Sequence, residues 1–533
     1  MRPGGVGYRR SAVAVGAAVL GTGLAAMLGS AAGTGIQPTA ASGPAPGSPA
    51  YMAGDVQNME AAFGREIGPG GELTSPAYLA GLGPDVAATA VAHGIDDAQD
   101  PTDPALTPGN LVPGWSAGAP DRSQWAGTRG QELSVHFAAP DGAVLAGTLF
   151  APLADATDPY THQPLSPPYP GVVIVTGSIQ ASAAMYAWLA EDLAERGYVV
   201  LTFDVQGQGQ SGTLPEQGPV GGVAGCDVPQ WVSSGNSSQA TPCDGVPSEQ
   251  QTSFDDDTEA AITYFESAAD PLSGELEHTF SNPADPSRHV PLALIGHSTG
   301  AVTVTYLQQV DSRIATVVAL DKITATCDAI ADDEAEITMP ALPCPITPEV
   351  PALGIQSEYG FAPQAYWEAS CSSFEPCPAA PDASYAPPNV DQAPDPNREE
   401  ATGFDTWQSA GVDSMLIVPR ASTHLDYTDE PPSLPASQWG QAMASYYTQA
   451  WLDRYLKGDE QTLSTLTNGP APHLLATSLV YLAPTPQGVW TSVTLDRDSH
   501  LSFYFCSGYS FAVQNGQSAG MARDDDLIGD GCS

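Results

Sequence analysis

The pattern Gly-x-Ser-x-Gly, which can place a nucleophilic serine on a tight turn, occurs three times in this chain. The matches span residues 114–118, 296–300 and 516–520. Because the chain holds 54 Gly among 533 residues, the bare pattern carries little weight and its context must decide. The chemistry requires a buried strand before the turn and a helix after it, so that a strained backbone lifts the serine hydroxyl clear of the sheet.

The central match has that context. The apolar run 292–295 precedes it, and the helix-compatible segment 301–310 follows it. Ser116 instead lies in a stretch flanked by prolines, and Ser518 has no histidine after it. The sequence therefore predicts Ser298 as the nucleophile.

A serine nucleophile needs a general base within hydrogen-bond reach. Of the nine histidines, His424 alone lies a few residues after an apolar strand-like run, 415–418, and before the amphipathic segment 438–457. We interpret His424 as the base. His297 adjoins the predicted nucleophile and is interpreted as a packing or hydrogen-bonding residue.

A third group must orient the imidazole, and two carboxylates are candidates for it. Asp321 ends the apolar run 317–320, and Glu358 follows the run 351–356. Either can reach His424, because adjacent strand ends lie only about 5 Å apart. The residues alone leave both candidates open.

The elements around these residues alternate between strand and helix patterns. A hairpin is predicted at 132–139 and 144–151, with the turn Pro140-Asp141-Gly142 between its strands. Further strands are expected at 171–175, 198–203, 290–295, 314–320, 351–356 and 414–419, and helices at 183–196, 254–268 and 438–457. This order predicts an α/β fold: a mostly parallel, doubly wound sheet with an N-terminal antiparallel hairpin and loop insertions at 205–250, 322–349 and 361–403.

Four segments are expected along the chain. A signal peptide occupies 1–32, a linker and irregular N-terminal region 33–130, the catalytic domain 131–458, and a small β appendage 459–533. In the second segment we expect at most a short helix around 59–63.

The sequence around the predicted nucleophile resembles the α/β-hydrolase superfamily. The resemblance rests on Gly296-His-Ser-Thr-Gly300, Val173-Ile-Val-Thr-Gly-Ser178 and the segment 189–203, and it covers about 132–457. Within that superfamily the chain is most similar to secreted bacterial cutinase-like polyester hydrolases and to plasma-type platelet-activating-factor acetylhydrolases. The resemblance implies an oxyanion hole formed by the backbone N–H groups of Ser178 and Thr299. Elementary electrostatics supports Thr299, because a helix N-terminus stabilises negative charge.

The resemblance also separates the two candidate acids. The polyester hydrolases carry an aspartate in the loop after the seventh strand, where this chain has Gly360. The acetylhydrolases carry their acid one strand earlier, at the place of Asp321, and have a stretch similar to Ser357-Glu-Tyr359. The comparison favours Asp321, with Glu358 as the alternative acid.

These inferences predict a secreted serine hydrolase that cleaves carboxylic esters through an acyl-enzyme. No cofactor is expected, and the substrate is a small-molecule, lipid or polyester ester. A serine peptidase or acylaminopeptidase is the alternative enzyme, since the same triad cleaves amides. A non-catalytic secreted binding protein with the same fold is the alternative outside enzymes.

Charge and compartment narrow the possible partners. Lys and Arg total 16 against 61 Asp and Glu, a net charge of −45, so nucleic acid would be repelled. Arg2, Arg9 and Arg10 precede an apolar stretch, 12–28, and the small residues 29–32, which is the pattern of an export signal. An uncleaved signal would be a membrane anchor. No later segment reaches the roughly 18 apolar residues that span a bilayer, so no membrane partner is expected after cleavage.

Eight cysteines in an exported chain predict disulfides. Neighbouring cysteines suggest these pairs: Cys226 with Cys243, Cys327 with Cys344, Cys371 with Cys377, and Cys506 with Cys532. Each pair would close a short loop in a surface insertion. A metal site is not expected, because the chain has no Cys-x-x-Cys pair.

Overall fold

The fold is known from a computed structural model, and the residues it describes fall into sixteen segments. These are 49–68, 71–99, 124–177, 181–206, 208–212, 251–277, 292–321, 323–324, 346–360, 363, 403–428, 437, 439–463, 471–484, 490–502 and 508–512. The predicted signal peptide, Ser178 and all eight cysteines lie outside them. In the described segments no helix has both the length and the apolar character needed to cross a membrane.

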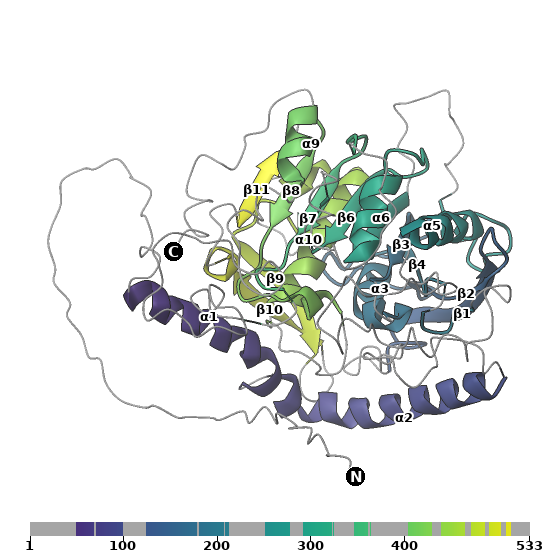
Figure 1. Cartoon of the computed structure of the whole chain (residues 1–533), viewed down its shortest axis with the longest axis horizontal. Helices are drawn as coiled ribbons and strands as arrows, with labels where there is room; N and C mark the ends of the chain where they lie inside the picture. The colour runs from purple at the N-terminus through teal and green to yellow at the C-terminus, as the bar shows by residue number, and fades with distance from the viewer. Residues whose placement is uncertain are drawn as a thin grey trace, which may run out of the picture. The chain divides into compact units, whose positions relative to one another are not determined.

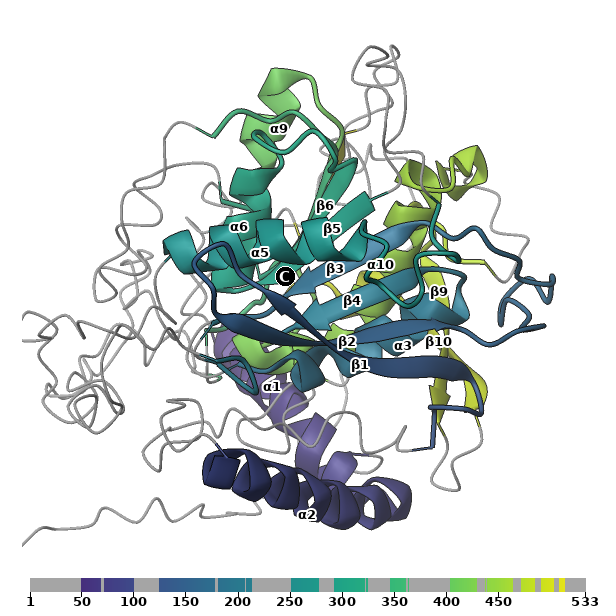
Figure 2. The same ribbon diagram turned by 90° about the vertical axis from the view of Figure 1, so that its right-hand side faces the viewer.

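A nine-stranded sheet forms the centre of the molecule, in the order β1-β2-β4-β3-β5-β6-β7-β8-β11 (Figure 1). The strands are β1 Gly130–Ala138, β2 Val144–Pro152, β3 Gly171–Val175, β4 Val199–Phe203, β5 Leu292–His297, β6 Thr316–Leu320, β7 Ala352–Ile355, β8 Ser414–Ile417 and β11 Tyr509–Ala512. Strands β3 to β8 pair in parallel. The β1–β2 hairpin is antiparallel and joins the sheet through β4 (Figure 2). The predicted mixed α/β architecture with a mostly parallel sheet is confirmed.

Helices cover both faces of this sheet, because its parallel strands are apolar on both sides. The helices α3 (Ala187–Glu195) and α10 (Gly440–Tyr455) share a core with Val172 and Ile174 of β3. The helices α5 (Gln251–Phe265) and α6 (Thr299–Leu307) share a second core with Val173 and Val175. Alternate residues of one strand therefore belong to opposite cores, as the two-residue period of a strand requires. Helix α9 (Phe404–Ala410) contributes Trp407 to the second core.

The N-terminal region differs from the sequence-based expectation. Instead of a single short helix it contains α1 (Pro49–Ile67), the 3₁₀ turn η1 (Glu72–Thr74) and α2 (Pro76–Gln99). Both long helices begin at a proline, which suits the first helical position. The buried face of α1 carries Asp55, Asn58 and Arg65 beside Ala62, so the apolar periodicity that indicates a helix is missing from its sequence.

The C-terminal region, where a small β appendage is expected, contains strands in two different sheets. Strands β9 (Ser478–Pro484) and β10 (Trp490–Asp496) form a two-stranded antiparallel sheet of their own. Strand β11, however, pairs antiparallel with β8 and extends the main sheet. Its Tyr509 and Phe511 join the core that contains α3 and α10. Further 3₁₀ turns in the described segments are η4 (Ala183–Tyr186), η10 (His424–Tyr427), η11 (Glu460–Leu463) and η12 (Asp498–His500).

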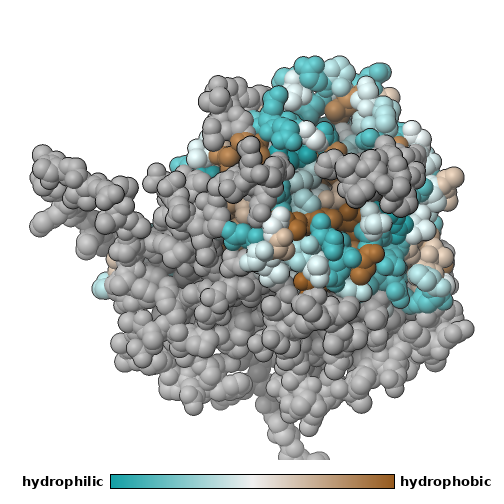
Figure 3. All heavy atoms as spheres, turned by 90° about the horizontal axis from the view of Figure 1, so that it is seen from above, coloured by the Kyte–Doolittle hydropathy of each residue, from teal (hydrophilic) through white to brown (hydrophobic). Residues whose placement is uncertain are grey.

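Several of the rare basic side chains lie in the interior rather than on the surface. Among the described residues, Arg65, Arg196, Arg454 and Arg497 are buried. In the coloured part of the view from above, hydrophilic residues surround smaller apolar patches (Figure 3).

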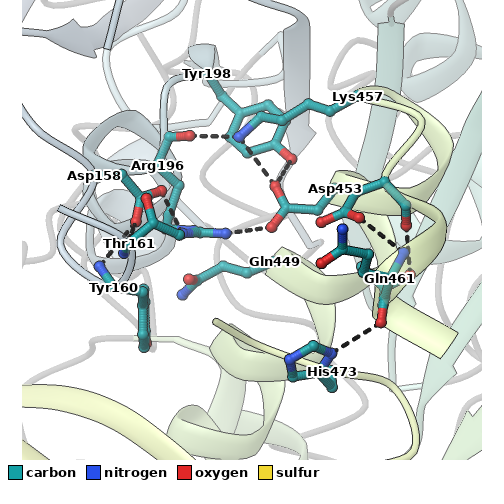
Figure 4. A network of polar contacts seen from close by, with 12 residues as sticks. Asp158, Tyr160, Thr161, Arg196, Tyr198, Gln449, Asp453, Lys457, Gln461 and His473 are labelled. Carbon is teal, nitrogen blue, oxygen red and sulfur yellow. Dashed lines mark hydrogen bonds and ion pairs between the residues drawn. The ribbon is translucent and has the colours of Figure 1, made fainter. Parts of the chain in front are cut away.

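A buried ion network ties α10 to the turn between α3 and β4 (Figure 4). The guanidinium of Arg196 bonds both Asp158 and Asp453. The hydroxyl of Tyr198 donates to Asp453 Oδ1 over 2.7 Å, and Lys457 Nζ lies 3.0 Å from the same oxygen. Burial alone would raise the pKa of Asp453, but the charges of Arg196 and Lys457 lower it to about 2.

Removing the central cation of this network should destabilise the fold strongly. We expect Arg196→Met to lower the free energy of unfolding by about 3–5 kcal/mol, because buried Asp158 loses its cationic partner and buried Asp453 loses one of two. The matched change Arg313→Met removes surface ion pairs to Asp311 and Glu266 and should cost about 1 kcal/mol or less. Denaturant titration of the three proteins measures both values, and equal losses would contradict the assignment.

Two buried carboxyls hold the segment that follows β4. Asp204 accepts the backbone N–H groups of Ala183, over 2.5 Å, and Gln210, over 2.8 Å. Asp257 accepts the N–H of Gln206 over 2.7 Å. Burial raises the pKa of Asp204 to about 6 and that of Asp257 to about 7, although these hydrogen bonds act in the opposite direction.

The raised pKa values make stability depend on pH in a defined direction. Both aspartates have an ordinary pKa of 3.8, so between about pH 4 and pH 7 the folded state binds more protons than the unfolded state. Their contribution to stability is therefore present at low pH and is lost as the pH rises. Asp257→Asn should remove its share of this loss. Urea unfolding at pH 4.5 and pH 8 tests this. The free energy of unfolding of the variant, relative to that of the wild type, must be higher at pH 8 than at pH 4.5.

Candidate active site

Ser298 lies at the turn between β5 and α6, in a backbone conformation that is strained for a residue with a side chain. Its φ is 56° and its ψ is −121°. The turn is held by hydrogen bonds on both sides of the residue. The N–H of Ser298 donates to the carbonyl of Leu320 over 3.2 Å, and its carbonyl accepts the N–H of Ala301 over 2.9 Å. The side chain is half-buried rather than buried, as a reacting hydroxyl requires.

The two glycines of the pattern are required by close backbone contacts. A Cβ at Gly296 would lie 2.0 Å from the carbonyl oxygen of Gly300. A Cβ at Gly300 would lie 2.5 Å from the carbonyl oxygens of Thr176 and Val175, at the end of β3. Strand, turn and helix can therefore pack this tightly only with glycine at both positions. The other two matches to the pattern lie outside the described residues.

Asp321 directly follows β6 and His424 lies in the segment after β8, and the two side chains meet at the carboxyl edge of the sheet. The Nδ1 atom of His424 hydrogen-bonds Oδ2 of Asp321. Because an ionised carboxylate can only accept, Nδ1 carries the proton and Nε2 is the accepting nitrogen of the ring. Asp321 has a φ of 81°, and its Oδ1 accepts the N–H of Ser357 over 2.7 Å as well as the Ser357 hydroxyl.

The alternative acid, Glu358, has other partners. Its Oε2 accepts from Asn58 Nδ2 and from the N–H of Ala421, each over 2.5 Å. Its Oε1 accepts the hydroxyl of Ser502 over 2.7 Å. Glu358 is fully buried, and this burial raises its pKa. The structure thus places Asp321 at Nδ1 of His424 and Glu358 beneath the segment that carries the histidine.

Of the two expected oxyanion donors, the structure describes only Thr299. Thr299 is buried and opens α6 directly after Ser298, so its backbone N–H belongs to the first turn of a helix. Ser178 lies outside the described residues. The residue before it, Gly177, is close to the turn: a Cβ there would lie 3.2 Å from the Cβ of Ser298.

His297 joins three parts of the site through hydrogen bonds. Its Nε2 lies 2.8 Å from the carbonyl oxygen of His424, and its Nδ1 lies 2.8 Å from the hydroxyl of Tyr186. The same hydroxyl accepts the N–H of Gly177 over 3.0 Å. Because a carbonyl only accepts, Nε2 of His297 carries the ring proton, and Nδ1 accepts from Tyr186.

The electrostatics of His297 agrees with this pattern. Burial lowers its pKa to about 3, with a further lowering from His424, so the ring stays neutral at ordinary pH. The rings of His297 and His424 lie 4.6 Å apart. The sequence indicated a packing or hydrogen-bonding role for His297, but it gave no signal for Tyr186, which is one of several apolar and aromatic residues in its segment.

No cluster of three or more potential metal-binding side chains occurs in the part of the chain that the structure describes. The arrangement of Ser298, His424 and Asp321 can support nucleophilic attack, proton transfer and stabilisation of the charged imidazole.

Comparison with known proteins does not assign this chain to a family. The chain matches none of the protein-family models and none of the curated proteins with which it was compared. Among solved structures it is similar to the crystal structure of a hypothetical protein from Pseudomonas aeruginosa, at 19% identity and a TM-score of 0.25. That similarity covers 39% of this chain and 46% of the other. A likeness this partial identifies neither a family nor an activity.

Proposed function

We propose that this protein is a serine hydrolase of the α/β-hydrolase superfamily and that it cleaves carboxylic esters through a covalent acyl-enzyme. The proposal is carried by the strained turn at Ser298, whose N–H bonds the carbonyl of Leu320 just before Asp321, together with the hydrogen bond between Asp321 and His424. The three residues follow one another along the chain in the order Ser, Asp, His, which is the order used on that fold.

Each side chain has a defined part in the proposed reaction. Ser298 Oγ attacks the ester carbonyl while Nε2 of His424 takes its proton. Asp321 keeps the other ring proton on Nδ1 and stabilises the imidazolium. The backbone N–H groups of Thr299 and Ser178 bind the oxyanion, and the alcohol leaves with the proton from His424. Water then attacks the acyl-enzyme by the same steps and releases the acid.

The proposal includes export from the cell. It rests on the basic and apolar pattern of residues 1–32 and on the even number of cysteines. An acidic, cation-poor surface suits an ester substrate without negative charge, because anionic ligands would be repelled.

Removing the proposed nucleophile should abolish the chemistry and leave the fold intact. Ser298→Ala should lose labelling by a fluorophosphonate probe and turnover of p-nitrophenyl esters, with nearly unchanged thermal stability. Ser116→Ala serves as the matched control and should behave as wild type. Labelling that persists in Ser298→Ala would exclude this serine. Peptide anilides, assayed beside the ester series, separate ester cleavage from peptidase activity.

The two carboxylates should differ sharply in their effect on turnover. Asp321→Asn should lower kcat by up to about four orders of magnitude, because the amide no longer fixes the tautomer of His424. Glu358→Gln should cost no more than about tenfold, because Glu358 supports the histidine segment without serving as the acid. Ester kinetics of both variants decide between them, and the reverse ranking would transfer the role to Glu358.

A further inference from the structure

The carboxylate of Glu358 joins three segments that lie far apart in the sequence. It accepts hydrogen bonds from Asn58 on α1, from Ser502 in the C-terminal region and from the backbone of Ala421. The sequence separations from Glu358 are 300, 144 and 63 residues. A fully buried carboxylate needs such donors, because an ionised group without them is costly to remove from water.

The segment 419–424, which leads from β8 to His424, is held along its whole length. Ala421 has a φ of 60°, which is unfavourable for a residue with a side chain, and its N–H donates to Glu358. The hydroxyl of Ser422 accepts the N–H of Glu358 over 2.9 Å. The N–H of His424 donates to the carbonyl of Gly360 over 3.0 Å. The position of the histidine therefore depends on the residues around Glu358.

Helix α1 contacts this segment on the side before His424. Asn58 Nδ2 donates to the hydroxyl of Tyr359 over 3.0 Å as well as to Glu358. Ala62, one turn further along the helix, packs in a small cluster with Tyr359 and Ala421. Polar and small residues on the buried face of α1 thus contact both the histidine segment and the residues at 358–359 that hold it.

The same helix acts on the side after His424. Asp426 accepts the N–H groups of Thr423, over 3.0 Å, and Ser437, over 3.1 Å, and so fixes the turn that His424 opens. Burial raises the pKa of Asp426 to about 7, and the positive charge of Arg65, also on α1, lowers it against that effect. Arg65 is buried, and it lies two turns after Asn58 on the same helix.

We propose that Asn58 and Glu358 are positioning residues, which clamp the segment that carries His424 and make helix α1 part of the catalytic apparatus. This inference rests on the proposed function. The physical reason is that a displacement of about 1 Å at a reacting group can lower a rate by about a hundredfold. A backbone held at an unfavourable φ at Ala421 would relax in that way if the clamp were lost.

The test uses the full chain and the kinetics of fluorophosphonate labelling at Ser298, which separate the maximal labelling rate, kinact, from the half-saturating probe concentration, KI. Asn58→Leu removes the amide donor at nearly constant volume. It should lower kinact by about tenfold while KI stays unchanged. Val56→Asn, on the exposed face of the same helix, is the matched control and should leave both values as in wild type.

Two further variants keep the test decisive if Asn58→Leu folds poorly. Ser502→Ala removes a donor from a different element and should show the same fall in kinact alone. In a Glu358→Gln background, Asn58→Leu should cost little, because no buried charge is left short of a donor. Strictly additive losses, or kinact values equal to wild type, would overturn the clamp. Absence of labelling in the wild-type protein would instead overturn the proposed function.

Discussion

The turn between β5 and α6 is the constraint on which the rest of the site depends. At residue 296 its backbone lies against the carbonyl of residue 300, and at residue 300 it lies against the end of β3, so neither position admits a side chain. This closeness raises Ser298 above the sheet and sets the first turn of α6 beside it. The energy that holds the strained conformation comes from the buried strands and helices on both sides, since a lone turn would relax. Strands β6, β7 and β8 end at the same edge of the sheet, and this places Asp321 and His424 at that edge.

Much of this arrangement could be predicted from the sequence, because it follows from local pattern. Apolar runs bounded by turn residues indicated the central strands, and the context of Ser298 favoured it over the other two matches to the pattern. The choice between Asp321 and Glu358 could not be made from the residues alone, because both follow neighbouring strands. The structure distinguishes them through backbone geometry: Asp321 has a φ of 81° and meets His424, whereas Glu358 is turned into the interior.

Several features that escaped prediction have partners that are remote in sequence. Helix α1 buries Asp55, Asn58 and Arg65, so its hydrophobic pattern does not reveal a helix. Strand β11 is recognisable only by its pairing with β8, almost a hundred residues earlier in the chain. Tyr186 acquires its role from a histidine that lies 111 residues away. Hydrophobic periodicity in a sequence indicates which face of an element is apolar. It does not reveal a buried face whose contacts are hydrogen bonds.

The distant donors of Glu358 have a consequence for the order of assembly. Contacts between residues 58 and 358, and between 358 and 502, close very long loops, and such contacts form late because their entropy cost must be met first. A nascent chain that has emerged only as far as His424 has its three central side chains but lacks Ser502 and strand β11. We therefore expect the histidine segment to settle after synthesis has passed residue 502. Under the proposed function, this timing would keep the unfinished chain inert toward the esters of the cell that makes it.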